Sequence, residues 1–492
     1  MKKAVCLALV ILMISSLFCA CKNNDEKLNK DDTTLEGTSL TQESLNVDDN
    51  GYIKDNLPDN LSYNGEQVTI LGWVADIDEW QSEKQNGNQV NDAIYERNAD
   101  VERRLNVELN YIMEKGNGEN AAQFISFVSK NVMAGESTFD VISCYSMVGA
   151  SLASQNMLLN LLNYDYLDFD MPWWPSDLTE HCIINNAMYF ASGDISPNLL
   201  YNMQIMVLNL DLLDSFGELE DPREFALDGT WTLDKMMSFC QNTYSDLNAN
   251  SIKDGEDQFG FTSVWTPDIA AFITSSGIKS VEPTSDNMLQ LTDDYTGEKM
   301  QGLLTTLCSF LHETNDAWYK EADNTQFFEG RTLLSANTPK TLMLYNDDID
   351  YKYGILPFPK YNQSQENYYT LVGNPFSLYG ILIDASEPEM SAAVIECMAS
   401  ESYRTVTPAV YETSFKCRYS SSEIDGAAFD IIRAGITFDY GRIYRLLLPI
   451  DLFYLFTSQL RDNNVIWAST MASYKDTINK SLETAIEKID TK

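Results

Sequence analysis

The sequence predicts an α/β protein built as two lobes. From residue 67 onward, short apolar runs rich in β-branched residues alternate with amphipathic helical patterns. The connections between them are short, which favours parallel strands with helices packed on a sheet. About 430 residues follow a polar N-terminal segment, too many for one compact hydrophobic core, so two lobes are expected.

The first lobe opens with a βαβαβ pattern. Residues 67–72 (QVTILG) form a short apolar run and are predicted to be a strand. Residues 91–105 carry apolar side chains at helical spacing among charged ones, which predicts a helix. A strand at 106–112, a helix at 121–134 and a strand at 139–144 (FDVISC) complete the pattern. This order predicts a parallel sheet with flanking helices.

The later elements predict lobes made of separate chain segments. Expected strands at 188–191 and 205–208 flank the sequence GDISP at 193–197. A Gly/Pro-containing segment between two sheets is typical of an interlobe hinge. The remaining elements are expected in this order: a helix at 231–242, strands at 259–262, 332–336, 353–358 and 376–383, and a helix from 388 onward.

These elements define discontinuous lobes. The first lobe is expected to contain residues 62–192 and 330–402, and the second residues 193–329 and 403–492. The chain should cross between the lobes three times, near residues 192–203, 328–332 and 400–404.

The N-terminus is predicted to export the chain. Lys2 and Lys3 precede an uncharged apolar run at 4–18, which is typical of a secretory signal and short for a membrane span. The following sequence LFCAC resembles a bacterial lipobox, so residues 1–20 are expected to be cleaved and Cys21 to carry lipid. An ordinary cleaved signal with an incidental cysteine is the alternative.

A flexible tether is expected after the lipid-bearing cysteine. Residues 21–61 are mostly polar, with isolated leucines and no sustained period, and so cannot bury a core. A random coil of this length has a reach of roughly 35 Å. We therefore expect a soluble body held at the outer face of the cytoplasmic membrane through its lipid alone.

Charge and cysteine content exclude several classes of partner. After removal of residues 1–20, 73 acidic residues face 31 basic ones, a formal charge of −42. Nucleic acid and anionic membranes are poor partners for such a field, and a solvated acidic surface is its simplest explanation. Six cysteines remain beyond Cys21 with no CxxC spacing, which indicates neither a redox motif nor a zinc knuckle and leaves disulfide pairing open. The apolar stretch 446–456 contains Pro449 and Asp451, so no later transmembrane helix is expected.

Several motifs together resemble one protein family. They are VNDAIYERN at 90–98, MPWW at 171–174, GTWTLDKM at 229–236, FEGR at 328–331 and YGILPFPKY at 353–361. In order and spacing these are similar to the extracellular solute-binding proteins of family 1, the carbohydrate-type lipoproteins of bacterial ABC importers, in a long form common in Firmicutes. The resemblance covers nearly all of the body.

The resemblance implies both a fold and a function. The fold would be the type II periplasmic-binding-protein-like clamp, or Venus flytrap, whose lobes close over a ligand at the hinge. The function would be capture of an extracellular carbohydrate, most naturally an oligosaccharide, by a monomer that delivers it to ABC permease subunits. The resemblance does not identify the ligand.

A polar loop is predicted to bind Ca²⁺. Oxygen-bearing side chains stand at positions 1, 3, 5, 9 and 12 of residues 246–257, and a residue whose carbonyl could ligate stands at position 7, as in an EF-hand-like loop. Two departures weaken the pattern: Ser251 replaces the usual glycine, and Asp257 the usual glutamate. The alternative is a turn rich in Asx residues. The candidate ligands are Asp246, Asn248, Asn250, Ile252, Asp254 and Asp257.

Aromatic and polar residues at strand ends are predicted to bind the sugar. Sugar rings stack on aromatic rings and their hydroxyls need polar partners, and open α/β sheets bind ligands at the carboxyl ends of their strands. Core packing is the competing explanation for each residue alone. Trp173 and Trp174 are left aside because such a pair can equally anchor lobe packing. The candidates are Trp73, Asp76, Tyr145, Trp265 and Asn337.

Enzymatic function is not expected. The chain has two histidines and lacks GxSxG, HExxH, GxxxxGK[ST] and GxGxxG, the usual signatures of nucleophilic, zinc-protease and nucleotide chemistry. A glycosidase needs only two carboxylates and is not excluded by counting. A surface glycan-binding or sensing lipoprotein without a transport role is a further alternative.

Overall fold

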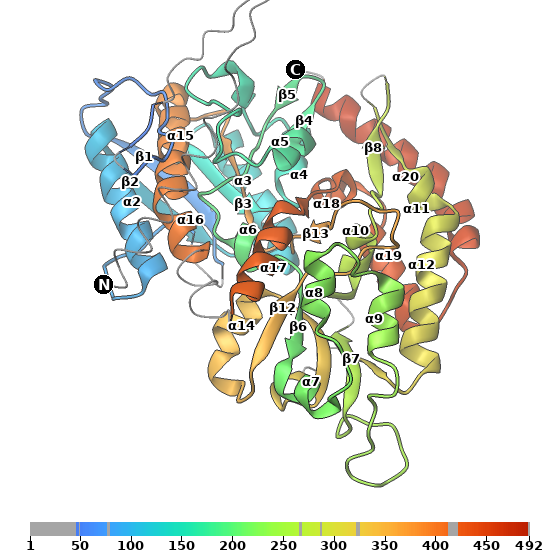
Figure 1. The fold of residues 1–492 in the computed structure, drawn as a ribbon. Coiled ribbons are helices and arrows are strands. Elements are labelled where there is room, and N and C mark those ends of the chain that lie inside the picture. The colour runs from blue at the N-terminus through green and yellow to red at the C-terminus, as the bar shows by residue number, and fades with distance from the viewer. Residues whose placement is uncertain are drawn as a thin grey trace, which may run out of the picture. The chain divides into compact units, whose positions relative to one another are not determined.

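The structure, a computed structural model, describes residues 46–48, 50–75, 79–264, 268–285, 288–320, 325–411 and 422–490 (Figure 1). Residues 46–492 form one compact unit. The expected signal sequence, Cys21 as the expected site of lipid attachment, and most of the expected tether lie outside the described residues.

The first sheet has four strands in the order β14-β3-β1-β2. β1 (Glu66–Trp73) pairs in parallel with β2 (Val107–Glu114) and with β3 (Val141–Tyr145), as the βαβαβ pattern predicts. β14 (Ser377–Ile381), from a distant part of the chain, adds antiparallel to β3. Every residue of β3 and β14 is buried, which is typical of strands covered on both faces.

Helices from distant parts of the sequence cover this sheet. Asn88 caps the N-terminus of α2 (Gln89–Leu105): its side chain accepts hydrogen bonds from the backbone N–H groups of Val90 and Asn91. The helix ends at Asn106, which adopts a left-handed conformation. α15 (Pro388–Arg404) packs against α2. The other helices of this lobe are α3 (Ala121–Ala134), α4 (Gly149–Ser154) and α5 (Ser176–Cys182).

The second sheet has five strands in the order β10-β7-β11-β6-β12. β7 (Phe259–Val264) lies parallel to β10 (Ala317–Lys320) and to β11 (Thr332–Asn337). β6 (Ile205–Asn209) runs antiparallel to β11 and to β12 (Tyr353–Leu356). β6 is buried throughout, and its alternate residues join two different hydrophobic cores on the two faces of the sheet.

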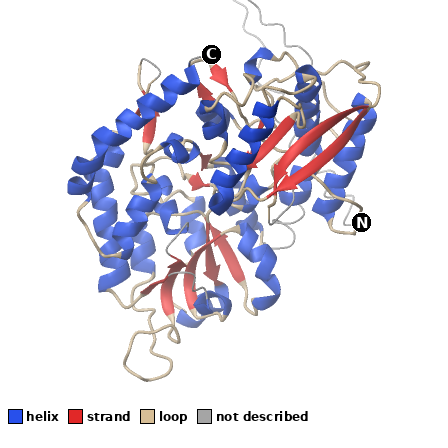
Figure 2. Ribbon diagram, turned by 180° about the vertical axis from the view of Figure 1, so that it is seen from behind, coloured by secondary structure: helices blue, strands red, loops and turns tan. Residues whose placement is uncertain are grey.

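Short helices and three small two-stranded sheets complete the body. Figure 2 shows the strands of the two main sheets as two separate groups bordered by helices. The small sheets are β4 (Ile183–Ile184) with β5 (Ala187–Met188), β8 (Val281–Pro283) with β9 (Leu289–Leu291), and β13 (Thr370–Leu371) with β15 (Ile436–Thr437). The remaining α-helices are α6 (Asn198–Tyr201), α7 (Leu210–Phe216), α8 (Pro222–Leu227), α9 (Leu233–Phe239), α10 (Ala271–Ser275), α11 (Asp293–Thr296), α12 (Glu298–Cys308), α13 (Thr325–Phe328), α14 (Pro339–Tyr345), α16 (Val406–Pro408), α17 (Glu423–Ala434), α18 (Tyr440–Ile443), α19 (Leu452–Arg461) and α20 (Trp467–Asp490).

Three segments carry the chain between the two sheets. The first, residues 189–204, runs from β5 to β6 and overlaps the expected hinge. The second, residues 357–376, runs from β12 to β14. The third follows α15, and its described residues are 405–411 and 422–438. Its helix α16 contacts α2, and its helix α17 contacts β12. We call these the crossing segments.

The second crossing differs from the expected one. The sequence placed residues 330–402 in the first lobe, with a crossing near 328–332. In the structure β11 and β12 pair with β6 and β7, so both strands belong to the second sheet. The chain returns to the first sheet only after β12, because the apolar pattern of a strand shows that it is buried and not which sheet it joins.

Trp173 and Trp174 anchor packing within the first lobe. Their side chains are buried, and both indole N–H groups donate to the carboxyl of Glu396 on α15, at 3.2 and 3.1 Å. Glu396 is itself buried, and that burial raises its pKa to about 8. The pair therefore ties the loop before α5 to α15.

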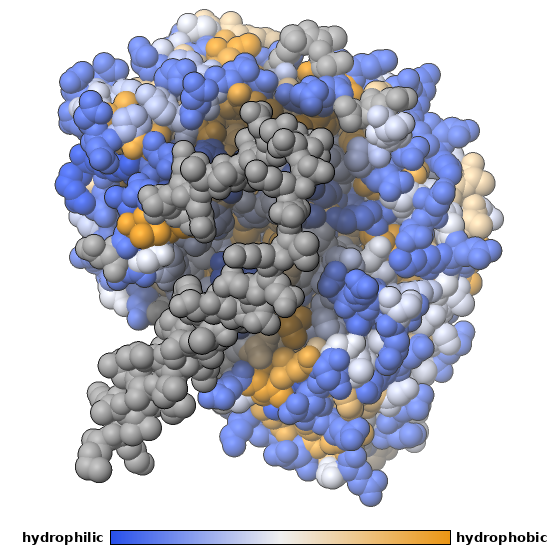
Figure 3. Space-filling model, turned by 45° about the horizontal axis from the view of Figure 1, so that its top comes forward, coloured by the Kyte–Doolittle hydropathy of each residue, from blue (hydrophilic) through white to orange (hydrophobic). Residues whose placement is uncertain are grey.

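The face drawn in Figure 3 is largely polar, and the described cysteines are free thiols. Hydrophobic residues on that face lie in separate areas. Within the described ranges, no helix has the length and apolar character needed to cross a membrane. Cys417 lies outside the described residues. The five described cysteines are buried free thiols: Cys144, Cys182, Cys240, Cys308 and Cys397.

Gly193→Ala is expected to destabilise the fold by about 1–3 kcal/mol, because a Cβ there would overlap the carbonyl oxygen of Trp173 and lie 2.8 Å from the ring of Trp174. Urea unfolding of the soluble body measures the effect. Gly118→Ala is the control, since its Cβ would meet the mobile end of the Met147 side chain at 3.3 Å. Equal loss in both variants would contradict the close contact at Gly193.

Candidate functional site

The two main sheets present particular edges to the crossing segments. In the second sheet, the register places the carboxyl ends of β11 and β12 beside the start of β6, and those of β7 and β10 at the same edge. In the first sheet, the carboxyl ends of β1 and β3 lie beside the start of β14. At these edges the first crossing segment enters β6, and the second leaves β12 and enters β14. Such edges are where open α/β sheets bind ligands.

Trp73 and Tyr145, two predicted sugar-binding residues, lie in contact at the first-sheet edge. Their rings meet edge to face with centroids 5.0 Å apart, and the exposed fractions are 5% for Trp73 and 9% for Tyr145. The indole N–H of Trp73 donates to Ser377 Oγ at 2.9 Å. The sequence thus identified two neighbouring aromatic residues, and the structure holds them as a buried pair.

The other predicted residues divide between the second sheet and the part of the chain that is not described. Asn337 is the last residue of β11 and is 1% exposed. Its Nδ2 donates to Ser335 Oγ at 2.9 Å, and its Oδ1 has no hydrogen-bond partner among the described residues. Asp76 and Trp265 lie outside the described residues.

Glu79 joins the loop after β1 to the first crossing segment and to β14, and it was not singled out from the sequence. It is 1% exposed, and its carboxyl oxygens accept hydrogen bonds from the hydroxyls of Ser196 and Ser377. Ser377 also receives the Trp73 indole N–H, so Glu79 is linked to the aromatic pair. Burial raises the pKa of Glu79 to about 7, against the opposing effect of its hydroxyl donors. A lone acidic residue gives no periodic signal that could have identified it.

A crevice of about 250 Å³ lies between the first and third crossing segments and the start of α5. Its charged lining residues are Asp177, Asp194 and Arg433, and Leu199 and Leu200 form part of its apolar wall. Asp194 Oδ2 has no hydrogen-bond partner in the described part of the chain, and burial raises the pKa of this carboxyl to about 7. Arg433 partly opposes that shift and stacks over the Tyr411 ring at 4.7 Å.

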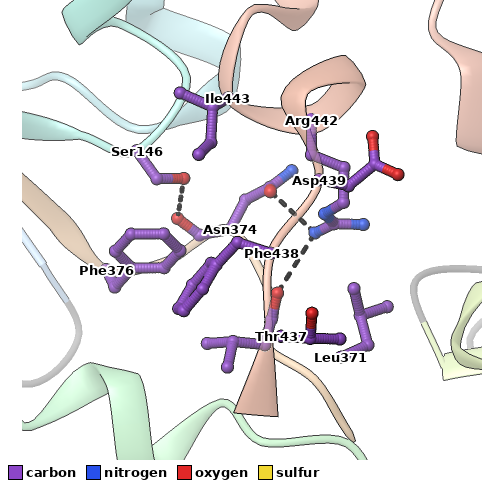
Figure 4. Close-up of a pocket in the computed structure, with 10 residues that line it drawn as sticks. Ser146, Leu371, Asn374, Phe376, Thr437, Phe438, Asp439, Arg442 and Ile443 are labelled. Carbon is purple, nitrogen blue, oxygen red and sulfur yellow. Dashed lines mark hydrogen bonds between the residues drawn. The ribbon is translucent and has the colours of Figure 1, made fainter. Parts of the chain in front are cut away.

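Arg442 fastens the second crossing segment (Figure 4). Its guanidinium donates to Asn374 Oδ1 at 2.7 Å and to the carbonyl oxygen of Val372 at 3.3 Å. Ser146, just after β3, donates to the carbonyl oxygen of Asn374 at 2.6 Å. The void that these residues enclose is about 10 Å³, the space of one water molecule, so this place is a joint and not a ligand cavity.

The predicted calcium loop is a chain of Asx turns. The carboxylate of Asp246 accepts hydrogen bonds from the backbone N–H groups of Asn250 and Ser251, at 3.3 and 2.8 Å. Ser251 adopts a left-handed conformation with φ 61°, which the usual glycine of such loops takes without strain. In the described ranges, no group of three or more His, Cys, Asp or Glu side chains is placed to hold a metal.

One atom of this loop fits a cation. Asp257 is fully buried, and its Oδ1 has no hydrogen-bond partner among the residues described. Its Oδ2 accepts from the Tyr244 hydroxyl at 2.8 Å and from the Asp254 N–H at 3.0 Å. A buried carboxylate oxygen without a donor is costly, and Ca²⁺ prefers such hard oxygen ligands. Asp257 Oδ1 could therefore supply one of the six to eight oxygens that Ca²⁺ takes.

Comparison with known proteins shows the fold. No family model and no curated protein matches the sequence. The cyclic alpha-maltosyl-1,6-maltose binding protein of Arthrobacter globiformis has 12% identity and a TM-score of 0.58, with 85% of this chain and 99% of that chain covered. The sugar-binding protein MalE of Xanthomonas citri has 11% identity and a TM-score of 0.56, with 87% and 100% covered.

A family 1 extracellular solute-binding protein of Bifidobacterium longum subsp. infantis shares the fold as well, at 12% identity and a TM-score of 0.52, with 87% of this chain and 100% of that chain covered. The predicted two-lobed, periplasmic-binding-protein-like fold is confirmed. The family that the sequence motifs resemble is represented among these structures.

Buried carboxyl groups should make the protein more stable at acidic than at neutral pH. The pKa is raised to about 7 for Glu79 and Asp194 and to about 8 for Glu396. Unfolded, such groups ionise near pH 4, so between about pH 5 and 7 the folded chain binds more protons and its stability falls as pH rises. The melting temperature measured at pH 5.5 and pH 8 checks this.

Glu79→Gln should reduce that pH dependence, because the amide cannot ionise. Glu282→Gln is the matched control: the side chain of Glu282 is exposed, so the same charge is removed without a buried titration. Identical pH profiles for wild type and Glu79→Gln would contradict a buried, protonated Glu79.

Proposed function

We propose that this chain is the exported, lipid-anchored substrate-binding component of an ABC importer, and that it binds an oligosaccharide between its two lobes. The observation that carries the proposal is the fold itself, in which crossing segments of the described chain join two sheets at the edges where open α/β sheets bind ligands. Solved structures with this fold include proteins named for binding maltose and cyclic alpha-maltosyl-1,6-maltose.

The chemistry of the sheet edges suits a sugar. Trp73 and Tyr145 supply aromatic surface at the first-sheet edge, and Asn337 supplies an amide at the second. An oligosaccharide offers C–H faces for stacking and hydroxyls for hydrogen bonds. Closure of the lobes is driven only by contacts that the ligand makes better in the closed state, so groups from both sheets should contribute.

Export and anchoring rest on the N-terminal sequence. The basic start, the apolar run and Cys21 support secretion followed by lipid attachment at the outer face of the cytoplasmic membrane. The partners would be ABC permease subunits, reached by a monomeric body whose acidic surface keeps it soluble.

Isothermal titration of the soluble body with maltose, cyclic alpha-maltosyl-1,6-maltose and longer oligosaccharides tests the binding function. Trp73→Ala and Tyr145→Ala should each weaken binding by about 1–3 kcal/mol, as expected for a desolvated aromatic anchor. Trp318→Ala is the control, because Trp318 lies within β10 and stacks on Phe259. A tight ligand whose affinity ignores both substitutions would place the site elsewhere, and release of sugar products would indicate a hydrolase.

Ca²⁺ is proposed as a structural ion of the loop at residues 246–257. Asp246, Asn248, Asn250, Asp254 and Asp257 would supply side-chain oxygens, and Ile252 its carbonyl. The support is the spacing of these residues together with the unpartnered Oδ1 of Asp257. The ion would neutralise part of a strongly acidic loop and fix the entry to β7.

Added Ca²⁺ should raise the melting temperature, because an ion bound only by the folded state stabilises it, by about 2.7 kcal/mol at a hundred times its Kd. Asp246→Ala should remove most of that gain. Asp228→Ala is the control, since Asp228 also caps an exposed turn, through the N–H of Thr230, but lies outside the loop. No change in melting temperature over millimolar Ca²⁺ would reduce the loop to a turn.

A further inference from the structure

We propose that Gln204 and Asp268, acting with Asn337, recognise hydroxyl groups of a neutral sugar at the edge of the second sheet. This inference rests on the proposed function and extends it by assigning two recognition residues and an uncharged ligand class. Neither Gln204 nor Asp268 stood out in the sequence.

Strand register places these residues at one edge. Gln204 is the residue before β6, and the first residue of β6, Ile205, pairs with Asn337 at the end of β11. Asp268 begins the short 3₁₀ helix Asp268–Ala270 that follows β7, the neighbour of β11. All three therefore lie where the first crossing segment enters the second sheet.

The backbone around Gln204 is fixed. Its N–H donates to the carbonyl oxygen of Leu371 at 2.8 Å, and the preceding residue, Met203, forms a bridge with Val372. The side chain thus projects from a segment held between two other parts of the chain. A fixed polar group recognises a ligand without the entropic cost of being ordered.

The side-chain amide of Gln204 lacks ordinary partners. Gln204 is 1% exposed, and neither its Oε1 nor its Nε2 makes a hydrogen bond of normal geometry with any described residue. Its amide interacts with the Asp268 carboxyl outside normal hydrogen-bond geometry, and this interaction opposes the rise in that carboxyl's pKa, which burial raises to about 7. Native proteins pair nearly all buried polar groups, so an amide whose one such contact is poorly aligned has capacity for a ligand hydroxyl.

Asn337, which pairs with Ile205, the residue after Gln204, also has a side-chain atom without a hydrogen-bond partner among the described residues. Its Nδ2 is used by Ser335, whose hydroxyl also receives that of Thr262 at 3.2 Å. Its Oδ1 is left without a donor among the described residues. The edge therefore offers one amide oxygen that needs a donor and one whole amide that needs both a donor and an acceptor.

Hydroxyl groups match these requirements. A sugar hydroxyl donates and accepts at once, so it can satisfy Oε1 or Nε2 of Gln204 and Oδ1 of Asn337. A carboxylate ligand would only accept and would lie beside Asp268, which at pH above 7 is itself increasingly ionised. The arrangement thus favours a neutral polyhydroxylated ligand.

Gln204→Leu tests the assignment, because leucine has a similar volume and no polar atoms. The ligand-free variant should melt at the wild-type temperature or about 1–2 °C above it, since no ordinary hydrogen bond is lost. Its affinity for maltose or cyclic alpha-maltosyl-1,6-maltose, whichever binds the wild type more tightly in isothermal titration, should fall about tenfold.

Gln459→Leu is the matched control. Gln459 is also buried, but its Nε2 donates to Thr470 Oγ1 at 2.8 Å between α19 and α20. This variant should melt at a lower temperature and keep its sugar affinity. Maltobionate, which adds a carboxylate to the same disaccharide frame, should bind wild type more weakly than maltose.

The outcomes separate the inference from the proposed function. Loss of stability with unchanged sugar affinity in Gln204→Leu would overturn the inference, because the amide would then be structural. Equal binding of maltobionate and maltose would overturn the neutral ligand class. If wild type binds neither sugar, the proposed function fails for these two sugars, and only the melting temperature of Gln204→Leu then tests the inference. An unchanged or raised melting temperature supports an unpartnered amide. A lowered melting temperature overturns the inference.

Discussion

Backbone hydrogen bonds between the crossing segments are the constraint on which the rest of the architecture depends. Gly373 donates to the carbonyl oxygen of Asn202, Gln204 to that of Leu371, and Thr370 to that of Gly435. Buried peptide groups need partners, and here the segments supply one another's. Each main sheet can bury its own apolar faces, but the position of one sheet relative to the other depends on the hydrogen bonds between the crossing segments. The strand ends that face these segments are therefore placed by the hinge.

The junction is polar in a way that a purely structural joint would not need. Glu79 and Asp268 are buried carboxyl groups whose pKa is raised to about 7. Keeping such groups buried costs stability unless they are protonated or hydrogen-bonded. Glu79 accepts hydrogen bonds from two serine hydroxyls, one on the first crossing segment and one at the start of β14, and the second of these also connects it to Trp73.

The sequence predicted some residues of the candidate site and missed others. Trp73 and Tyr145 could be predicted because each directly follows a recognisable apolar run, and parallel strands bring such ends to one edge. Asn337 was predicted in the same way. Glu79 and Gln204 could not be, since each is significant only through partners distant in the chain or through the lack of them. The Trp173–Trp174 pair was conspicuous in sequence, yet its role as a donor pair for Glu396 depended on where α15 packs.

The sequence by itself determined the α/β class, the order of strands and helices, and the need for two lobes, because periodicity and turn residues act over a few neighbouring positions. Only the tertiary structure decided that β11 and β12 join the second sheet and that β14 closes the first. Which strands pair depends on contacts between distant segments, and the local sequence of a buried apolar strand does not specify its partner. The same reason explains the site: the residue types at strand ends are local, whereas burial and unsatisfied hydrogen bonds exist only once both sheets are assembled.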